Sequence, residues 1–222
     1  MRRSMIMTLA AVLLCACSAE TKEPEPVTVA MVGDSIFYGT WAPNGENETI
    51  EAYLQESLPE GSTVYNFGVS GCTLQDEADQ PYTAEPAYRE SLVSEADYYI
   101  IMLGTNDAKK YNWDPERYAA DYRTFVQEYI DRSGTGRVYA VIPPRAFKDP
   151  VTHEYNFSIM PGVIDQLPQI ITDAAEELGI DVIDLYTLTK DHPEWYWDGI
   201  HPNTDGNKAI AEEIYRTVFN QK

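Results

Sequence analysis

Residues able to serve as nucleophile, base and acid stand near the two ends of this chain. Ser35 follows Val-Gly-Asp, and a serine hydroxyl can attack a carbonyl carbon once a base removes its proton. Asp198 lies three residues before His201, a spacing that lets its carboxylate accept a hydrogen bond from Nδ1 of the imidazole. These residue types predict acyl transfer through a serine, provided that the fold brings Ser35 and His201 together.

Each motif has a simpler structural explanation when it is taken alone. Ser35 could cap a helix, and Asp34 is interpreted as a loop carboxylate and not as the catalytic acid. Asn106 could belong to an ordinary turn, and Gly68 and Gly71 could be glycines that turns require. The positions of these residues relative to the predicted strands therefore decide between structure and chemistry.

Five short apolar runs, separated by segments of helical periodicity, predict alternating strands and helices. The predicted strands cover residues 27–32, 63–67, 98–103, 137–142 and 181–185. The predicted helices cover residues 49–57, 85–94, 115–131, 163–178 and 204–219. Near-continuous apolar strands in such an alternation indicate a parallel sheet covered on both faces. The expected fold class is α/β, a three-layer α/β/α sandwich with a five-stranded parallel sheet of the flavodoxin-like type.

Three residues refine the expected helix ends. Asp114 precedes Pro115, which is the order expected for an N-cap followed by a proline in the first helical position. Gly179 is expected to end the helix that precedes it. Pro168 interrupts the segment 163–178, so we expect a kink or two shorter helices there.

Chemically capable residues follow directly after the predicted strands. Ligand sites of parallel sheets lie beyond the carboxyl ends of the strands, so residues in these positions can meet. The blocks are Gly-Asp-Ser at 33–35, Asn-Phe-Gly-Val-Ser-Gly at 66–71, Gly-Thr-Asn-Asp at 104–107, Pro-Pro at 143–144 and Asp-Gly-Ile-His-Pro at 198–202. In identity, order and rough spacing, the blocks resemble those of the SGNH, or GDSL-like, hydrolase family.

The resemblance extends from residue 27 to about residue 219 and implies a serine esterase. It implies that Ser35 is the nucleophile, that His201 is the base and that Asp198 orients the imidazole. The N–H groups of Ser35 and Gly68 and the side-chain amide of Asn106 would form the oxyanion hole. The implied mechanism is two-step acyl transfer, with no metal and no organic cofactor.

Two further histidines and a cysteine are interpreted as structural. His153 and His192 lack the sequence context of His201 and are expected to be surface residues. No group of cysteines and histidines has the spacing of a zinc site. Cys72 is expected to be a small buried residue, because nothing near it in sequence would depress the pKa of its thiol.

The expected partner is an ester of a glycan or of another small molecule. The strings at 104–113 and 191–203 look like those of bacterial carbohydrate acetylesterase-like SGNH proteins, which implies O-deacetylation of a glycan. Aromatic rings suit sugars, although each ring could equally pack in the core. The aromatic candidates are Trp41, Tyr82, Tyr88, Trp113, Trp195, Tyr196 and Trp197. The alternatives are a lysophospholipase or acyl-thioesterase and, in a different class, a lipid-anchored glycan-binding protein without turnover.

The first 26 residues predict export and membrane attachment. Residues 1–16 have two arginines before an apolar run and are expected to be a lipoprotein signal peptide. The string Leu-Cys-Ala-Cys at 14–17 looks like a bacterial lipobox, which implies lipidation of Cys17. The alternative is ordinary cleavage near an incidental cysteine. Residues 17–26 would then form an acidic flexible tether and residues 27–222 the hydrolase domain, lipid-anchored to the bacterial cell envelope.

Charge limits the possible partners. The formal net charge is −20, whereas nucleic-acid binding depends on Lys and Arg side chains that neutralise phosphates. Nucleic acid is therefore excluded as an expected partner, and the acidic surface is interpreted as a device for solubility. The sequence carries no indication of an oligomeric state.

Overall fold

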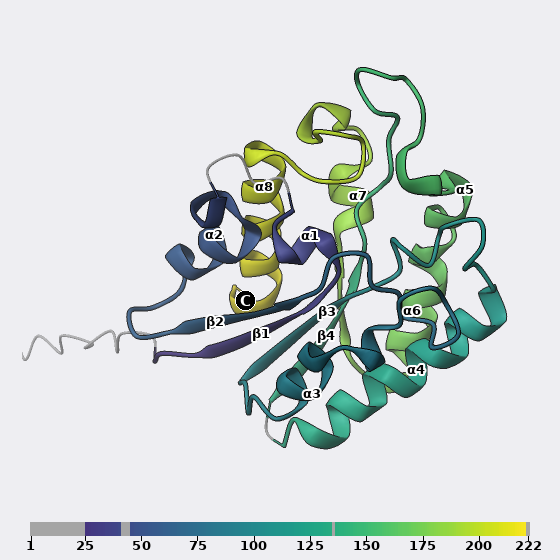
Figure 1. Ribbon diagram of the computed structural model, residues 1–222. Helices are drawn as coiled ribbons and strands as arrows, with labels where there is room; N and C mark the ends of the chain where they lie inside the picture. The colour runs from purple at the N-terminus through teal and green to yellow at the C-terminus, as the bar shows by residue number, and fades with distance from the viewer. Residues whose placement is uncertain (1–24, 41–44, 135, 221–222) are drawn as a thin grey trace, which may run out of the picture.

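A computed structural model describes residues 25–40, 45–134 and 136–220, and these ranges contain one sheet of five parallel strands (Figure 1). The strands are β1 (Thr28–Gly33), β2 (Thr63–Gly68), β3 (Tyr98–Met102), β4 (Arg137–Ile142) and β5 (Asp181–Asp184). Their order across the sheet is β2-β1-β3-β4-β5. The predicted α/β fold with a five-stranded parallel sheet is confirmed, and β1, whose end carries Ser35, lies between β2 and β3.

Helices cover both faces of the sheet and complete three layers (Figure 1). One face carries α1 (Ser35–Tyr38), α2 (Ile50–Ser57), α7 (Leu185–Thr189) and α8 (Thr204–Phe219). The other face carries α3 (Pro86–Leu92), α4 (Pro115–Arg132), α5 (Pro161–Ile164) and α6 (Leu167–Leu178). Short 3₁₀ turns are η1 (Gly45–Glu48), η2 (Tyr82–Ala84), η3 (Asn156–Ser158) and η4 (Pro193–Trp195).

Strand β1 shows why the strands are apolar along their whole length. Ala30 and Val32 pack into the core that includes α4 and α6, whereas Val29 and Met31 pack into the core that includes α2 and α8. All four side chains are fully buried. A strand that is buried on both faces needs apolar side chains at successive positions, which explains the absence of a two-residue alternation.

The helix ends follow the local signals in the sequence. The Asp114 side chain accepts hydrogen bonds from the N–H groups of Glu116 and Arg117 at 3.1 and 3.0 Å and caps α4. Gly179 ends α6 in the left-handed conformation, with φ of 69°. The prediction of two shorter helices around Pro168 is confirmed, because α5 ends at Ile164 and Pro168 lies in the first turn of α6.

Part of the N-terminal prediction lies outside the described residues. The predicted signal peptide, Cys17 and most of the tether fall within residues 1–24, which the structure does not describe. Trp41 falls within residues 41–44, which it does not describe either. Across residues 25–40, 45–134 and 136–220, no helix has both the length and the apolar character needed to cross a membrane.

Candidate active site

Ser35 stands at a sharp turn from strand to helix. β1 ends at Gly33, and α1 begins at Ser35. Between them Asp34 has an extended backbone, and its Oδ1 accepts a hydrogen bond from the N–H of Ile36 at 3.0 Å. Capping of the helix by Asp34 fixes the turn and holds Ser35 beyond the carboxyl end of β1. The Ser35 side chain is thereby placed at the edge of the sheet, where the neighbouring strands also end.

Ser35, His201 and Asp198 form a continuous chain of hydrogen bonds. Nε2 of His201 lies 2.9 Å from Oγ of Ser35, and Nδ1 of His201 lies 2.7 Å from Oδ2 of Asp198. The serine and the histidine are 166 positions apart in sequence, so the fold alone brings them together. Hydrogen bonds on both ring nitrogens fix the imidazole so that Nε2 can take the hydroxyl proton of Ser35.

The turn that carries Asp198 and His201 organises itself through the same carboxylate. Oδ1 of Asp198 accepts hydrogen bonds from the N–H groups of Ile200 at 2.9 Å and His201 at 2.8 Å. Burial alone would raise the pKa of Asp198, but the hydrogen bonds from the His201 ring and from these N–H groups outweigh burial and lower it. Asp198 is therefore an anion that orients the imidazole and stabilises its protonated form.

A cavity of about 320 Å³ opens at Ser35. Its lining combines polar residues from four different loops with an apolar wall. The lining residues are Ser35, Thr40, Ser70, Gly71, Thr105, Asn106, Lys109, Phe157, Ile159, Ile200 and His201. The cavity therefore contains the reactive pair and leaves space for a small ester beside it.

Asn106 reaches this cavity from the loop after β3. Its Nδ2 donates to the carbonyl oxygen of Cys72 at 3.1 Å, which fixes the side chain and leaves the second amide hydrogen for a ligand. The next residue, Asp107, is fully buried and accepts hydrogen bonds from the N–H groups of Leu74 and Gln75, both at 2.9 Å. Asp107 thus binds the loop after β2 to the loop after β3.

Gly68 is not part of this cavity, which corrects its predicted place in the oxyanion hole. Its N–H donates to Oδ1 of Asn66 at 2.9 Å and is therefore occupied. A Cβ at position 68 would lie 2.4 Å from the backbone nitrogen of Tyr38. Glycine is needed here because α1 packs directly against the end of β2, a structural role that supports the Ser35 turn indirectly.

Gly71, three residues after Gly68, does line the cavity. It has φ of 88°, a conformation that favours glycine. Within the described part of the chain, the backbone N–H groups of Gly71 and Ser35 donate to no acceptor, so both could donate to a ligand. The sequence motif contains two glycines, three residues apart, and only the path of the loop distinguishes them.

Comparisons with known proteins identify the family to which this site belongs. The family model described as GDSL-like lipase/acylhydrolase matches residues 31–209. The chain belongs to the GDSL-like lipase/acylhydrolase family. The predicted family resemblance is thus confirmed, and the family is one of acylhydrolases.

Relatives of this GDSL-like chain include proteins named for carbohydrate esters. An acetylxylan esterase of Xylanibacter ruminicola is 31% identical over 90% of this chain, which spans only 45% of that protein. A carbohydrate acetylesterase of Sinorhizobium meliloti has a TM-score of 0.66 at 20% identity, covering 86% of this chain and 98% of its own. A GDSL-family lipolytic protein of Veillonella parvula has a TM-score of 0.67 at 20% identity, covering 88% and 99%. At these identities the two structures show the shared fold.

The other polar candidates of the GDSL-like chain lie away from Ser35. His153 is exposed, and His192 stacks on Trp195 with ring centroids 3.8 Å apart, so neither histidine lines the cavity. Cys72 is fully buried, and burial raises the pKa of its thiol to about 12. Among the described residues, no group of three or more His, Cys, Asp or Glu side chains could hold a metal ion.

None of the aromatic candidates that the structure describes lines the cavity. Tyr82 is fully buried, and Tyr88 stacks on Phe125 in the core with ring centroids 5.6 Å apart. Trp197 is 48% exposed on the surface. The aromatic ring that does line the cavity belongs to Phe157, which sequence reasoning missed because it lies in a loop without a motif.

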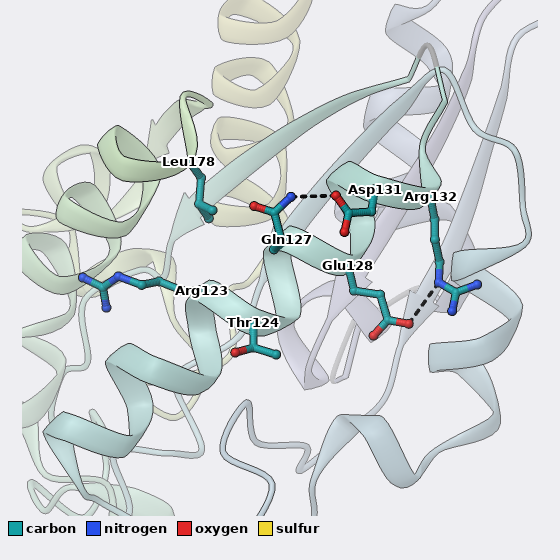
Figure 2. Close-up of a pocket in the computed structure, with 7 residues that line it drawn as sticks. All are labelled: Arg123, Thr124, Gln127, Glu128, Asp131, Arg132 and Leu178. Atoms are coloured by element: carbon teal, nitrogen blue, oxygen red, sulfur yellow. Dashed lines mark hydrogen bonds and ion pairs between the residues drawn. The ribbon is translucent and has the colours of Figure 1, made fainter.

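A larger hollow of about 710 Å³ lies along α4, and four of the side chains that line it form two pairs with one another (Figure 2). Gln127 donates to Asp131 at 2.7 Å, and Arg132 donates to Glu128 at 3.0 Å. The described residues that line the hollow include no histidine or cysteine. Of these two cavities, the smaller one at Ser35 is the one whose described lining combines a nucleophile with a base.

Proposed function

We propose that this GDSL-like chain is a serine esterase that removes acetyl groups from a carbohydrate. The observation that carries the proposal is the hydrogen-bonded chain from Ser35 through His201 to Asp198 at the mouth of a cavity. A serine in this arrangement becomes nucleophilic because the imidazole removes its proton as the oxygen attacks.

In the first step, Ser35 attacks the ester carbonyl and His201 takes the hydroxyl proton. The carbonyl oxygen becomes an oxyanion, for which the N–H groups of Ser35 and Gly71 and the free amide hydrogen of Asn106 are the donors at hand. Donors that are fixed before the reaction stabilise this charge without reorganisation, and each is worth about 3 kcal/mol. We assign the oxyanion hole to Ser35, Gly71 and Asn106.

Release of the alcohol completes this first step, and release of the acid is the second. Protonated His201 donates its proton to the oxygen of the leaving alcohol, and an acetyl group remains on Ser35. His201 then removes a proton from water, and the water oxygen attacks the acetyl carbon while the same oxyanion hole holds the carbonyl oxygen. His201 returns this proton to Oγ of Ser35 as the Ser35–acetyl bond breaks and the acid leaves. Asp198 stabilises the imidazolium in both halves of the reaction, and its lowered pKa keeps it ionised.

Acetyl esters of carbohydrates are the favoured substrates for two reasons. The cavity of about 320 Å³ lies near the lower end of the range for small-molecule pockets, which suits a short acyl group. The relative from Xylanibacter ruminicola is named an acetylxylan esterase. A lysophospholipase or acyl-thioesterase would need room for a longer acyl chain.

Release of acetate from defined esters tests the proposal. Wild-type protein and Ser35→Ala would be assayed on acetylated xylan, acetylated monosaccharides, short nitrophenyl esters, lysophospholipid and acyl-CoA. We expect Ser35-dependent release of acetate from the carbohydrate esters. Turnover confined to lysophospholipid or acyl-CoA would contradict the proposed substrate, and equal release by Ser35→Ala would contradict the mechanism.

The N-terminal motif supports a separate proposal, attachment of the protein to a bacterial membrane through Cys17. The lipobox-like string at 14–17 and the acidic segment that follows would hold the hydrolase domain away from the bilayer. Detergent partitioning of the full chain in its bacterial host tests it. Cys17→Ala is expected to move the protein from the detergent phase to the aqueous phase, and an unchanged distribution would contradict lipidation.

A further inference from the structure

Phe157 is the aromatic residue in the wall of the cavity and lies against the catalytic base. Its ring centroid is 5.4 Å from that of His201, and the two rings are nearly perpendicular, at 81°. Although it touches a buried histidine, Phe157 is 49% exposed. About half of the Phe157 surface is therefore open to solvent, and the residue lines the cavity.

The backbone at Phe157 is held in an unusual conformation. Phe157 has φ of 58° and ψ of 20°, and Ser158 has φ of 60°. Two consecutive residues with side chains in the left-handed region are strained, because Cβ approaches the carbonyl oxygen. Such strain persists only where surrounding contacts hold the segment in place.

Contacts on both sides hold this segment against the site. Asn156 donates through Nδ2 to Oδ2 of Asp149 at 2.9 Å and to the backbone oxygen of Asp198 at 3.0 Å. On the other side, the backbone oxygen of Ser158 accepts from the N–H of Lys110 at 3.3 Å. The chain between β4 and α5 projects beyond the carboxyl ends of the strands in Figure 1. It is thus bound to the loop of Asp198 and to the loop that follows Asn106.

The proton transfer from His201 to the leaving oxygen indicates which part of the substrate lies next to Phe157. His201 must protonate the leaving oxygen, so the alcohol portion of the ester lies on the His201 side of Ser35. The oxyanion donors Gly71 and Asn106 hold the carbonyl oxygen instead. A ring packed against His201 in the same cavity therefore borders the alcohol and not the oxyanion.

Lys109 adds a polar group to this wall. It forms a β-bridge with Ile159, lines the cavity, and its side chain is 12% exposed. Its Nζ pairs with Oδ2 of Asp79 at 3.3 Å, and an ammonium group has three donors, so this pair leaves donors for a hydroxyl group. An apolar ring face beside hydrogen-bond donors suits a sugar, which presents C–H groups on its faces and hydroxyls at its edge.

We propose that Phe157 is the platform on which the sugar ring of the leaving alcohol packs, so that Phe157 determines specificity for carbohydrate esters. This proposal rests on the proposed esterase function. The strained loop places the platform beside His201, and the substrate's ring covers the exposed part of Phe157 during the reaction.

The test compares an acetylated methyl xylopyranoside with ethyl acetate, whose alcohol has no ring. We expect Phe157→Ala to lower the ratio of kcat/KM for the sugar ester to kcat/KM for ethyl acetate about tenfold, mainly through KM of the sugar ester. Phe157→Tyr and Phe157→Trp retain an aromatic face and should keep the ratio within about threefold. Tyr65→Ala removes a similarly exposed ring on β2, outside the cavity, and should leave the ratio unchanged.

The outcomes distinguish the platform from the esterase itself. An equal loss on both esters would overturn the proposal, because Phe157 would then act only by supporting His201. An unchanged ratio in Phe157→Ala would overturn it as well. If wild-type protein hydrolyses ethyl acetate but no sugar ester, the carbohydrate substrate and the platform both fail while the esterase stands. If wild-type protein hydrolyses neither ester, the proposed function itself fails.

Discussion

At the scale of single residues, the chemistry depends on where each buried polar group finds its hydrogen-bond partner. His201 uses both ring nitrogens, one toward Ser35 and the other toward Asp198. Asn106 uses one amide hydrogen on the carbonyl oxygen of Cys72 and keeps the other for the cavity. The site is thus organised before a substrate arrives, which is the condition for electrostatic stabilisation of a transition state.

Asn106→Ala is expected to lower kcat about 10²- to 10³-fold, because the oxyanion loses a fixed donor. The value of KM should change little, since the ground-state carbonyl oxygen carries only partial charge. Steady-state kinetics on an acetyl ester, with a thermal melt to confirm folding, measure both effects. A folded variant with unchanged kcat would remove Asn106 from the oxyanion hole.

The raised pKa of Asp107 leads us to expect that its contribution to the free energy of unfolding depends on pH. Burial raises its pKa from 3.8 to about 6, although N–H groups of Leu74 and Gln75 oppose the shift. The folded state therefore binds more protons between these values, so the contribution of Asp107 to the free energy of unfolding decreases as pH rises, by about 3 kcal/mol in all.

The comparison of wild-type protein with Asp107→Asn isolates this effect, because asparagine does not titrate. The stability of the wild type relative to the variant should decrease between about pH 4 and pH 6.5. Urea unfolding at several pH values gives the two free energies. A constant difference would show that Asp107 ionises normally in the folded protein, and a difference that increases with pH would show a lowered pKa; either result would contradict the prediction.

At the scale of elements, the short helix α1 is the part that positions Ser35, and its packing depends on β2. Nδ2 of Asn66 donates to the backbone oxygen of Phe37 at 2.7 Å, and Oδ1 of Asn66 accepts from Gly68. The backbone of α1 can approach β2 this closely because residue 68 has no Cβ. The strand and the helix thus hold Ser35 between them.

Gly68→Ala should therefore reduce the free energy of unfolding by about 1–3 kcal/mol, the usual cost of overpacking. The cause is the Cβ that would lie 2.4 Å from the Tyr38 backbone nitrogen. Gly162→Ala in α5 is the matched control, since its Cβ would meet nothing within 4 Å. Denaturant unfolding should separate the two variants. Equal stability would show that α1 shifts to accommodate the methyl group.

The longer elements were predicted well from the sequence, because an apolar pattern that extends over many residues is a strong signal. The sequence predicted β4 as residues 137–142, where the strand lies, and placed the other strand ends within one residue. It did not predict α1 and α7, which are four and five residues long and too short to show a helical period. Gly71 and Phe157 were missed for a related reason, since their positions depend on loop paths.

At the scale of the whole molecule, the strongly negative net charge bears on which esters can reach the cavity at Ser35. The formal net charge of −20 repels anions from every direction, although Lys109 contributes one positive charge to the cavity. Acetylated neutral sugars feel no such repulsion. The charge of the molecule thus favours neutral esters over anionic ones at low ionic strength.

This charge makes activity on anionic esters dependent on salt. The kcat/KM for an acetyl ester that carries a carboxylate should rise several-fold between about 20 mM and 500 mM NaCl, because salt screens the repulsion. The kcat/KM for a neutral acetyl ester should stay constant in the same series. A decrease with salt on the anionic ester would indicate that attraction to Lys109 exceeds the repulsion by the surface.

The central claim is that the fold makes Ser35 a nucleophile through His201. Labelling with a fluorophosphonate tests it most directly, because this reagent bonds to an activated serine and reports no property of the substrate. We expect labelling of the wild type at Ser35 alone, no labelling of Ser35→Ala, and much slower labelling of His201→Ala. Absence of label from the folded wild type, or equal labelling of Ser35→Ala, would contradict the account.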